Sequence, residues 1–125
     1  MRLLLDTHIA IWLVRDAPEL GPRARQLMLD AESVHFSSAS LWEATIKVGL
    51  GKLPLDPQRL ADQLQRTGVR PLAVTWQHAL AVHRLPPLHK DPFDRLLVAQ
   101  AMAEPLHLLT HDAALVPYSE LVILV

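Results

Sequence analysis

The chain has 125 residues, half of them apolar, which is enough for one globular domain around one core. It has no cysteine, which excludes disulfides and thiolate metal sites, and its apolar runs are too short to span a membrane. The net charge of −1 provides no overall basic field, so any nucleic-acid binding must rely on a local patch. Met1-Arg2 leads into an apolar run without a signal-peptide pattern, and we expect a cytoplasmic protein.

Short apolar runs alternate with helical patterns, which indicates an α/β fold with a mostly parallel sheet. Strands are predicted at Arg2–Leu5, Val34–Ser37, Val69–Val74, Leu106–Thr110 and Leu121–Val125. The third should be an edge strand, because Pro71 cannot donate a hydrogen bond within a central ladder. We therefore predict one domain, residues 1–125, with a sheet of about five strands flanked by helices.

Capping residues and helix breakers predict the helices between these strands. They are expected at about residues 8–14, 22–31, 40–50, 57–68, 75–84 and 92–104, with a short helical turn after Asp112. Residues 86–90 should form an irregular loop. Trp12, Trp42 and Trp76 lie in apolar helical patterns, so we expect core packing in preference to base stacking.

Four acidic residues lie at predicted strand–helix junctions. Asp6 and Asp112 each follow a strand, whereas Glu43 and Asp94 each lie near the start of a helix. The carboxyl ends of parallel strands share one sheet edge, so these side chains can converge there. Converging carboxylates repel one another unless a cation neutralises them, and Mg²⁺ or Mn²⁺ prefers oxygen ligands. A metal held in this way indicates phosphodiester chemistry.

Each acid also has a purely local explanation. Asp6 and Asp112 would be favourable helix caps. Ser40 and Glu43 fit a capping box, in which Glu at the third helical position bonds back to the cap. Asp91 and Asp94 would stand at the N-cap and third position of one helix, again favourably. Residues that only cap helices need not lie at one sheet edge, whereas ligands of one metal must. The positions of the four acids in space therefore distinguish local capping from a shared metal site.

Four stretches carry a family resemblance: LLLDTHIAIWLV, SSASLWEATIKVGLGKL, HKDPFDRLLVAQA and LLTHD. With these stretches in this order, essentially the whole chain resembles the PIN-domain family, and in particular the VapC-type ribonuclease toxins of toxin–antitoxin pairs. Asp6, Glu43 and Asp94 fall on the three core acidic positions of the family, and Asp112 falls on its commoner fourth. Asp91 matches an additional Asp of this branch. Thr110 matches a small hydroxyl residue that often accompanies the fourth acid, and His111 lies where the family varies.

The resemblance implies an endoribonuclease that uses Mg²⁺ (or Mn²⁺) to activate water for attack on an RNA phosphodiester. Asp6 and Asp94 are the expected metal ligands, Asp112 would bind directly or through water, and Glu43 would help to hold the metal or orient its water. Thr7, Ser38 and Thr110 could support these carboxylates, or could simply make local capping and turn hydrogen bonds.

Partners are expected from the same resemblance: a small antitoxin laid over helices near the active site, RNA as substrate, and a second copy of the chain in a homodimer. The run from Ile9 to Val14 is apolar almost all round its helix, so it is either fully buried or partly a docking patch.

Basic residues gather before and within the third acidic stretch and could form a rim that holds RNA phosphates, or could be a solvated loop. They are His83, Arg84, His89, Lys90 and Arg95. The seven histidines show no close metal-binding spacing, so zinc is not expected.

Three other functions are compatible with part of this sequence pattern. A non-toxin RNA-processing PIN nuclease would share the acids, whereas a non-catalytic PIN-like binding module would be expected to lose some of them. A receiver-type signalling domain needs an acidic pair after the first strand and a lysine near the last. Here Asp6 stands alone and the last lysine is Lys90.

Overall fold

Five parallel strands form the sheet in the computed structural model, which describes residues 1–125. They are β1 (Arg2–Leu5), β2 (Ser33–Ser37), β3 (Arg70–Leu72), β4 (His107–Thr110) and β5 (Val122–Leu124). Their order is β3-β2-β1-β4-β5, and every neighbouring pair is parallel. The predicted α/β fold is confirmed, and β3, which contains Pro71, lies at the edge as expected.

The helices agree with the predicted ones to within a few residues at each end. They are α1 (Thr7–Arg15), α2 (Pro22–Asp30), α3 (Ser38–Gly49), α4 (Pro57–Arg66), α5 (Trp76–Val82), α6 (Pro92–Ala103) and the 3₁₀ helix η1 (Ala113–Tyr118). None of these helices has both the length and the apolar character needed to cross a membrane.

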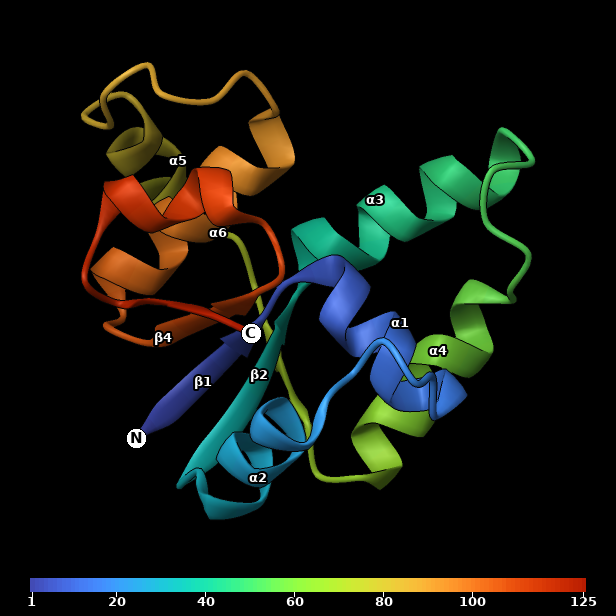
Figure 1. The fold of residues 1–125 in the computed structure, drawn as a ribbon. Coiled ribbons are helices and arrows are strands. Elements are labelled where there is room, and N and C mark those ends of the chain that lie inside the picture. The colour runs from blue at the N-terminus through green and yellow to red at the C-terminus, as the bar shows by residue number, and fades with distance from the viewer.

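Side chains of β1 alternate between two hydrophobic clusters, one on each face of the sheet. Leu3 and Leu5 pack with residues of α1, α2 and α4, whereas Leu4 packs with residues of α6 and η1. Figure 1 shows α1 and α4 on one side of the strands and α5 and α6 on the other. Burial on both faces holds the sheet rigidly, and with it the junctions that follow β1 and β4.

The start of α3 differs from the prediction. Its N-cap is Ser37, whose Oγ accepts the Ala39 N–H at 3.1 Å, so the helix begins two residues before Ser40. Ser40 is buried inside the helix, and the predicted capping box with Glu43 is wrong. The cause lies in the run of serines, because Ser37 can cap as well as Ser40 and is reached first at the end of β2.

Two of the three tryptophans lie on the surface, contrary to the expectation of core packing. Trp42 is 62% exposed and Trp76 is 89% exposed. Both helices have an outer face without a partner within this chain, and the apolar pattern alone does not show which face that is. Trp42 packs edge-to-face on Phe93 of α6, with the ring centroids 5.4 Å apart.

Candidate active site

A pocket of about 410 Å³ contains all four predicted acids. They come from the β1–α1 junction, α3, α6 and the β4–η1 junction, and Trp12 is the only apolar residue beside them. The lining residues are Asp6, His8, Trp12, Glu43, Lys47, Asp91, Asp94, His111 and Asp112. Residues from four separate parts of the chain therefore meet at the carboxyl edge of the sheet.

Asp6 both caps a helix and faces the pocket. Its Oδ1 accepts the Thr7 N–H at 2.7 Å as the N-cap of α1, and its Oδ2 accepts the Thr110 hydroxyl at 2.6 Å. Burial raises the pKa of Asp6, although the two hydrogen bonds and His8 oppose the rise. The capping explanation is thus correct for Asp6, and it coexists with a place in the pocket.

Glu43 points from the second turn of α3 toward α1. Thr7 Oγ1 donates to Glu43 Oε1 at 2.6 Å, and Lys47, one turn later on the same helix, places Nζ 3.2 Å from Glu43 Oε2. Thr7 and Thr110 therefore each bond one pocket carboxylate, while any part they play in metal binding stays a prediction.

Asp91 and Asp94 occupy the predicted positions at the start of α6. Asp91 Oδ1 accepts the N–H groups of Phe93 and Asp94, at 2.8 and 3.1 Å, as the N-cap. Burial, followed by the negative charges of Asp6, Asp91 and Glu43, raises the pKa of Asp94 to about 7. The pocket therefore holds more negative charge than its own cations offset.

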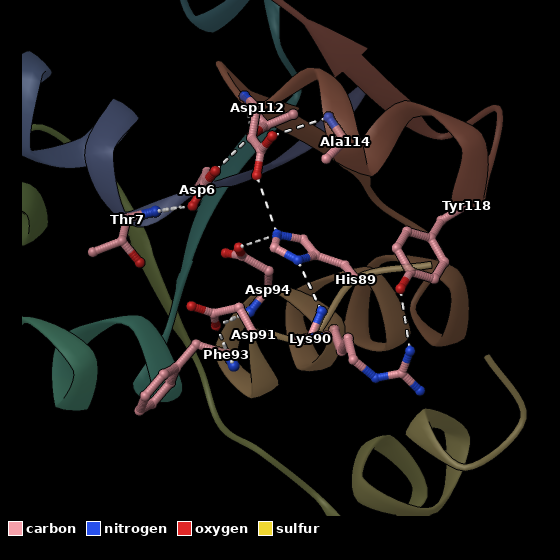
Figure 2. Close-up of polar contacts among 12 residues, drawn as sticks. Asp6, Thr7, His89, Lys90, Asp91, Phe93, Asp94, Asp112, Ala114 and Tyr118 are labelled. Carbon is pink, nitrogen blue, oxygen red and sulfur yellow. Dashed lines mark hydrogen bonds and ion pairs between the residues drawn. The ribbon is translucent and has the colours of Figure 1, made fainter. Parts of the chain in front are cut away.

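Asp112 caps η1, with Oδ1 accepting the Ala114 N–H at 2.9 Å. Its other oxygen, Oδ2, lies 3.3 Å from His89 Nε2, and the same nitrogen lies 3.0 Å from Asp94 Oδ2. Figure 2 shows the His89 ring between these two carboxylates. His89 is thus the one member of the predicted basic rim that contacts the acids.

The other residues of the predicted rim do not line the acidic pocket, and a part in RNA binding stays a prediction for them. Arg95 donates to the Tyr118 hydroxyl at 3.1 Å and to the Pro86 carbonyl at 2.9 Å, so it anchors the loop before α6. Arg84 lines a separate pocket beside Met102. Lys90 is exposed and, like His83, is not among the residues that line the acidic pocket. Ser38 is also exposed and lines a different pocket.

Four lining residues, Lys47, Trp12, His8 and His111, were not predicted as site residues from the sequence. Lys47 stands four positions after Glu43, a spacing that places both side chains on one helix face. Trp12 forms an aromatic wall with His8 and His111, with ring centroids 6.2 and 5.2 Å from the indole. His8 and His111 are sequence neighbours of the acids that follow β1 and β4, and this adjacency was the available signal.

The donor set fits a hard divalent cation. Carboxylate oxygens predominate. The pKa of Asp94 is raised by burial and then by repulsion from the neighbouring acids, and a cation would relieve that repulsion. His89, which contacts two of these carboxylates, forms a possible ligand group with Asp94 and Asp112, in which one ligand atom from each residue lies within 4.8 Å of the others. Such a site can hold Mg²⁺ or Mn²⁺ against a bound phosphate.

The model of the PIN domain family matches residues 3–120. Among solved structures, the fold is similar to VapBC2 from Rickettsia felis bound to a DNA fragment from its promoter, at 18% identity and a TM-score of 0.70, covering 100% of this chain and 98% of that one. DNA-bound VapBC from Salmonella typhimurium is similar at 18% identity and a TM-score of 0.70, covering 100% and 97%. A toxin–antitoxin complex from Klebsiella pneumoniae is similar at 19% identity and a TM-score of 0.66, covering 97% and 95%. No curated protein matches significantly.

Proposed function

Because the chain belongs to the PIN domain family, a family of nucleases, we propose that it is a divalent-metal-dependent endoribonuclease and the toxin of a toxin–antitoxin pair. The observation that carries this proposal is the meeting of Asp6, Glu43, Asp94 and Asp112 in one pocket. The proposed substrate is an RNA phosphodiester bond.

Mg²⁺ or Mn²⁺ is the proposed cofactor, held by Asp6 and Asp94, with Asp112 binding directly or through water. Such an ion, when bound, activates water and stabilises negative charge on a phosphate. The protein contributes orientation: Thr110 fixes the Asp6 carboxylate and Thr7 fixes that of Glu43. Glu43 would then orient water beside the metal, with Lys47 offsetting its charge.

A small antitoxin is the proposed partner, supported by similarity to the toxin–antitoxin complex from Klebsiella pneumoniae. Ile9, Ala10 and Ile11 of α1 are buried, whereas the second half of the helix, from Trp12 to Val14, stays partly exposed. Trp12 also lines the acidic pocket, so a partner docked over this half of α1 would cover the site. We further propose a homodimer, for which the exposed Trp76 and Leu80 of α5 offer apolar surface.

Cleavage of labelled RNA tests the nuclease proposal. The purified chain should cut RNA with Mg²⁺ or Mn²⁺ present, and EDTA should stop the reaction. The Asp94→Asn variant should be inactive, whereas Asp30→Asn should match wild type, because Asp30 is an exposed acid that bonds only Gln26. Intact RNA with the wild-type chain and either metal would favour a non-catalytic binding module instead.

The strand order argues against a receiver-type domain. Receiver-type sheets follow the order 2-1-3-4-5, whereas this sheet follows 3-2-1-4-5. A non-toxin RNA-processing nuclease would share the site, and it differs from a toxin only in its effect on growth.

A further inference from the structure

His89 occupies an unusual position for a loop residue, with its ring between two pocket carboxylates. Nε2 lies 3.0 Å from Asp94 Oδ2 and 3.3 Å from Asp112 Oδ2. The loop that carries it is anchored, because Arg95 donates to the Pro86 carbonyl at 2.9 Å and to the Val82 carbonyl at 3.3 Å. The ring is therefore held at the site by the fold around it.

The distances alone would also suit a metal ligand. Ligands about 2.1 Å from an octahedral ion lie about 3.0 Å apart at neighbouring positions, close to the two separations found here. His89 Nε2 can bind a metal only through a lone pair, and it can donate a hydrogen bond only if it carries a proton.

The hydrogen bond at the other ring nitrogen decides between these two states. The Lys90 backbone N–H donates to His89 Nδ1 at 3.0 Å, so Nδ1 carries no proton and the neutral ring has its proton on Nε2. A histidine that binds metal through one nitrogen normally donates a proton from the other. His89 has the opposite arrangement, and so presents an N–H to the pocket.

We propose that His89 is a substrate-binding residue and not a metal ligand. Asp94 and Asp112 would hold the cation, and His89 Nε2–H, which now faces their carboxylates, would donate to a non-bridging oxygen of an RNA phosphate bound beside them. This inference rests on the proposed nuclease function. Among the residues of the predicted basic rim, it assigns the phosphate contact to His89, because Arg95 bonds Tyr118 and Arg84 lines a separate pocket.

Metal binding without RNA is the first test. The free Mn²⁺ signal in electron paramagnetic resonance gives the affinity for wild type, His89→Ala and His89→Phe. We expect both variants to bind Mn²⁺ as tightly as wild type or a few-fold more tightly, since the competing donor is gone. A tenfold or greater loss, or nitrogen coupling to bound Mn²⁺ in the wild-type pulsed spectrum, would identify a ligand and overturn the proposal.

Cleavage kinetics at saturating Mn²⁺ are the second test. His89→Ala should lower kcat/KM roughly 10- to 100-fold, the size of one hydrogen bond to a charged group. His89→Gln should recover part of this loss, because its amide keeps an N–H, whereas His89→Phe should not. RNA with sulfur at a non-bridging position should slow the wild type more than His89→Ala.

The outcomes separate the two proposals. An active wild type with unchanged kcat/KM in His89→Ala would overturn only the role of His89. A wild type that binds Mn²⁺ and leaves RNA intact would instead overturn the nuclease function on which that role rests.

Discussion

Thr110 donates its hydroxyl proton to Asp6 Oδ2 over 2.6 Å, although 104 positions separate the two residues in the sequence. The same hydroxyl oxygen accepts the Asp112 N–H at 3.0 Å. Thr110 is fully buried at the end of β4, beside the end of β1. One hydroxyl thus sets the positions of two pocket acids, and it can do so because adjacent parallel strands end at the same edge.

Replacing this hydroxyl should weaken the site at both acids. Thr110→Val keeps the shape but removes the donor to Asp6 and the acceptor for Asp112. We expect roughly tenfold weaker Mn²⁺ binding and a loss of about 1–3 kcal/mol in the free energy of unfolding. Titration with Mn²⁺ and thermal denaturation measure the two effects. Thr110→Ser, which keeps the hydroxyl, is the matched control, and equal Mn²⁺ affinity in the Val variant would contradict the assigned role.

Removing the Asp94 charge should stabilise the metal-free protein. Its folded-state pKa of about 7 lies above the ordinary 3.8, so folding disfavours the charged form. The destabilisation is absent below pH 3.8, grows as the pH rises to 7 and is complete above it. Because Asp94 is partly solvated and the repulsion is screened, we expect Asp94→Asn to raise Tm by only roughly 4 °C at pH 8.

That gain should largely disappear near pH 4, because Asp94 is protonated in the folded state and the unfolded-state carboxyl is then close to its own pKa of 3.8. With saturating Mn²⁺ the wild type should become more stable than Asp94→Asn, because the ion stabilises the folded wild type and not the variant. Differential scanning calorimetry at pH 4 and pH 8, with and without Mn²⁺, checks both statements. A variant less stable than wild type at pH 8 without metal would show that burial and repulsion of the charged Asp94 do not outweigh the contacts that its carboxylate makes.

Metal affinity should depend on pH through the same carboxyl group. An ion can bind the Asp94 carboxylate only after its proton has left, and the pKa of about 7 places this competition near neutrality. We expect Mn²⁺ affinity to fall about tenfold for each pH unit below 7 and to level off above it. Calorimetric titration from pH 5.5 to 8.5 gives the profile, and a flat profile would show that Asp94 is not a ligand.

The convergence of the acids could be predicted from sequence because it follows from topology. Once the strands are parallel, residues just after β1 and β4 must share an edge, whatever their side chains contact. The basic rim could not be predicted in the same way. Arg95 follows Asp94 directly, and one helical residue turns the side chain by about 100°, which directs it to Tyr118 and away from the acids.

Details of loops and of the surface could not be predicted from the sequence either. The choice among Ser37, Ser38 and Ser40 as the cap of α3 depends on where β2 ends, which the serine run does not fix. The exposure of Trp42 and Trp76 depends on which helix faces lack a neighbour. The tautomer of His89 depends on one backbone N–H in an irregular loop, for which no sequence pattern exists.

Expression in bacterial cells distinguishes a toxin from a general RNA-processing nuclease. Unrestrained wild-type chain should stop growth, and Asp6→Asn should not, because the variant loses one of the two proposed metal-binding carboxylates. Asp30→Asn is the control that should arrest growth like wild type, since it removes an acid far from the pocket. A co-expressed partner that docks over the exposed half of α1 should restore growth, and freeing the chain from the purified complex should restore cleavage. High-level expression of the wild type without harm, combined with brisk RNA cleavage in vitro, would contradict the toxin assignment and leave the nuclease assignment intact.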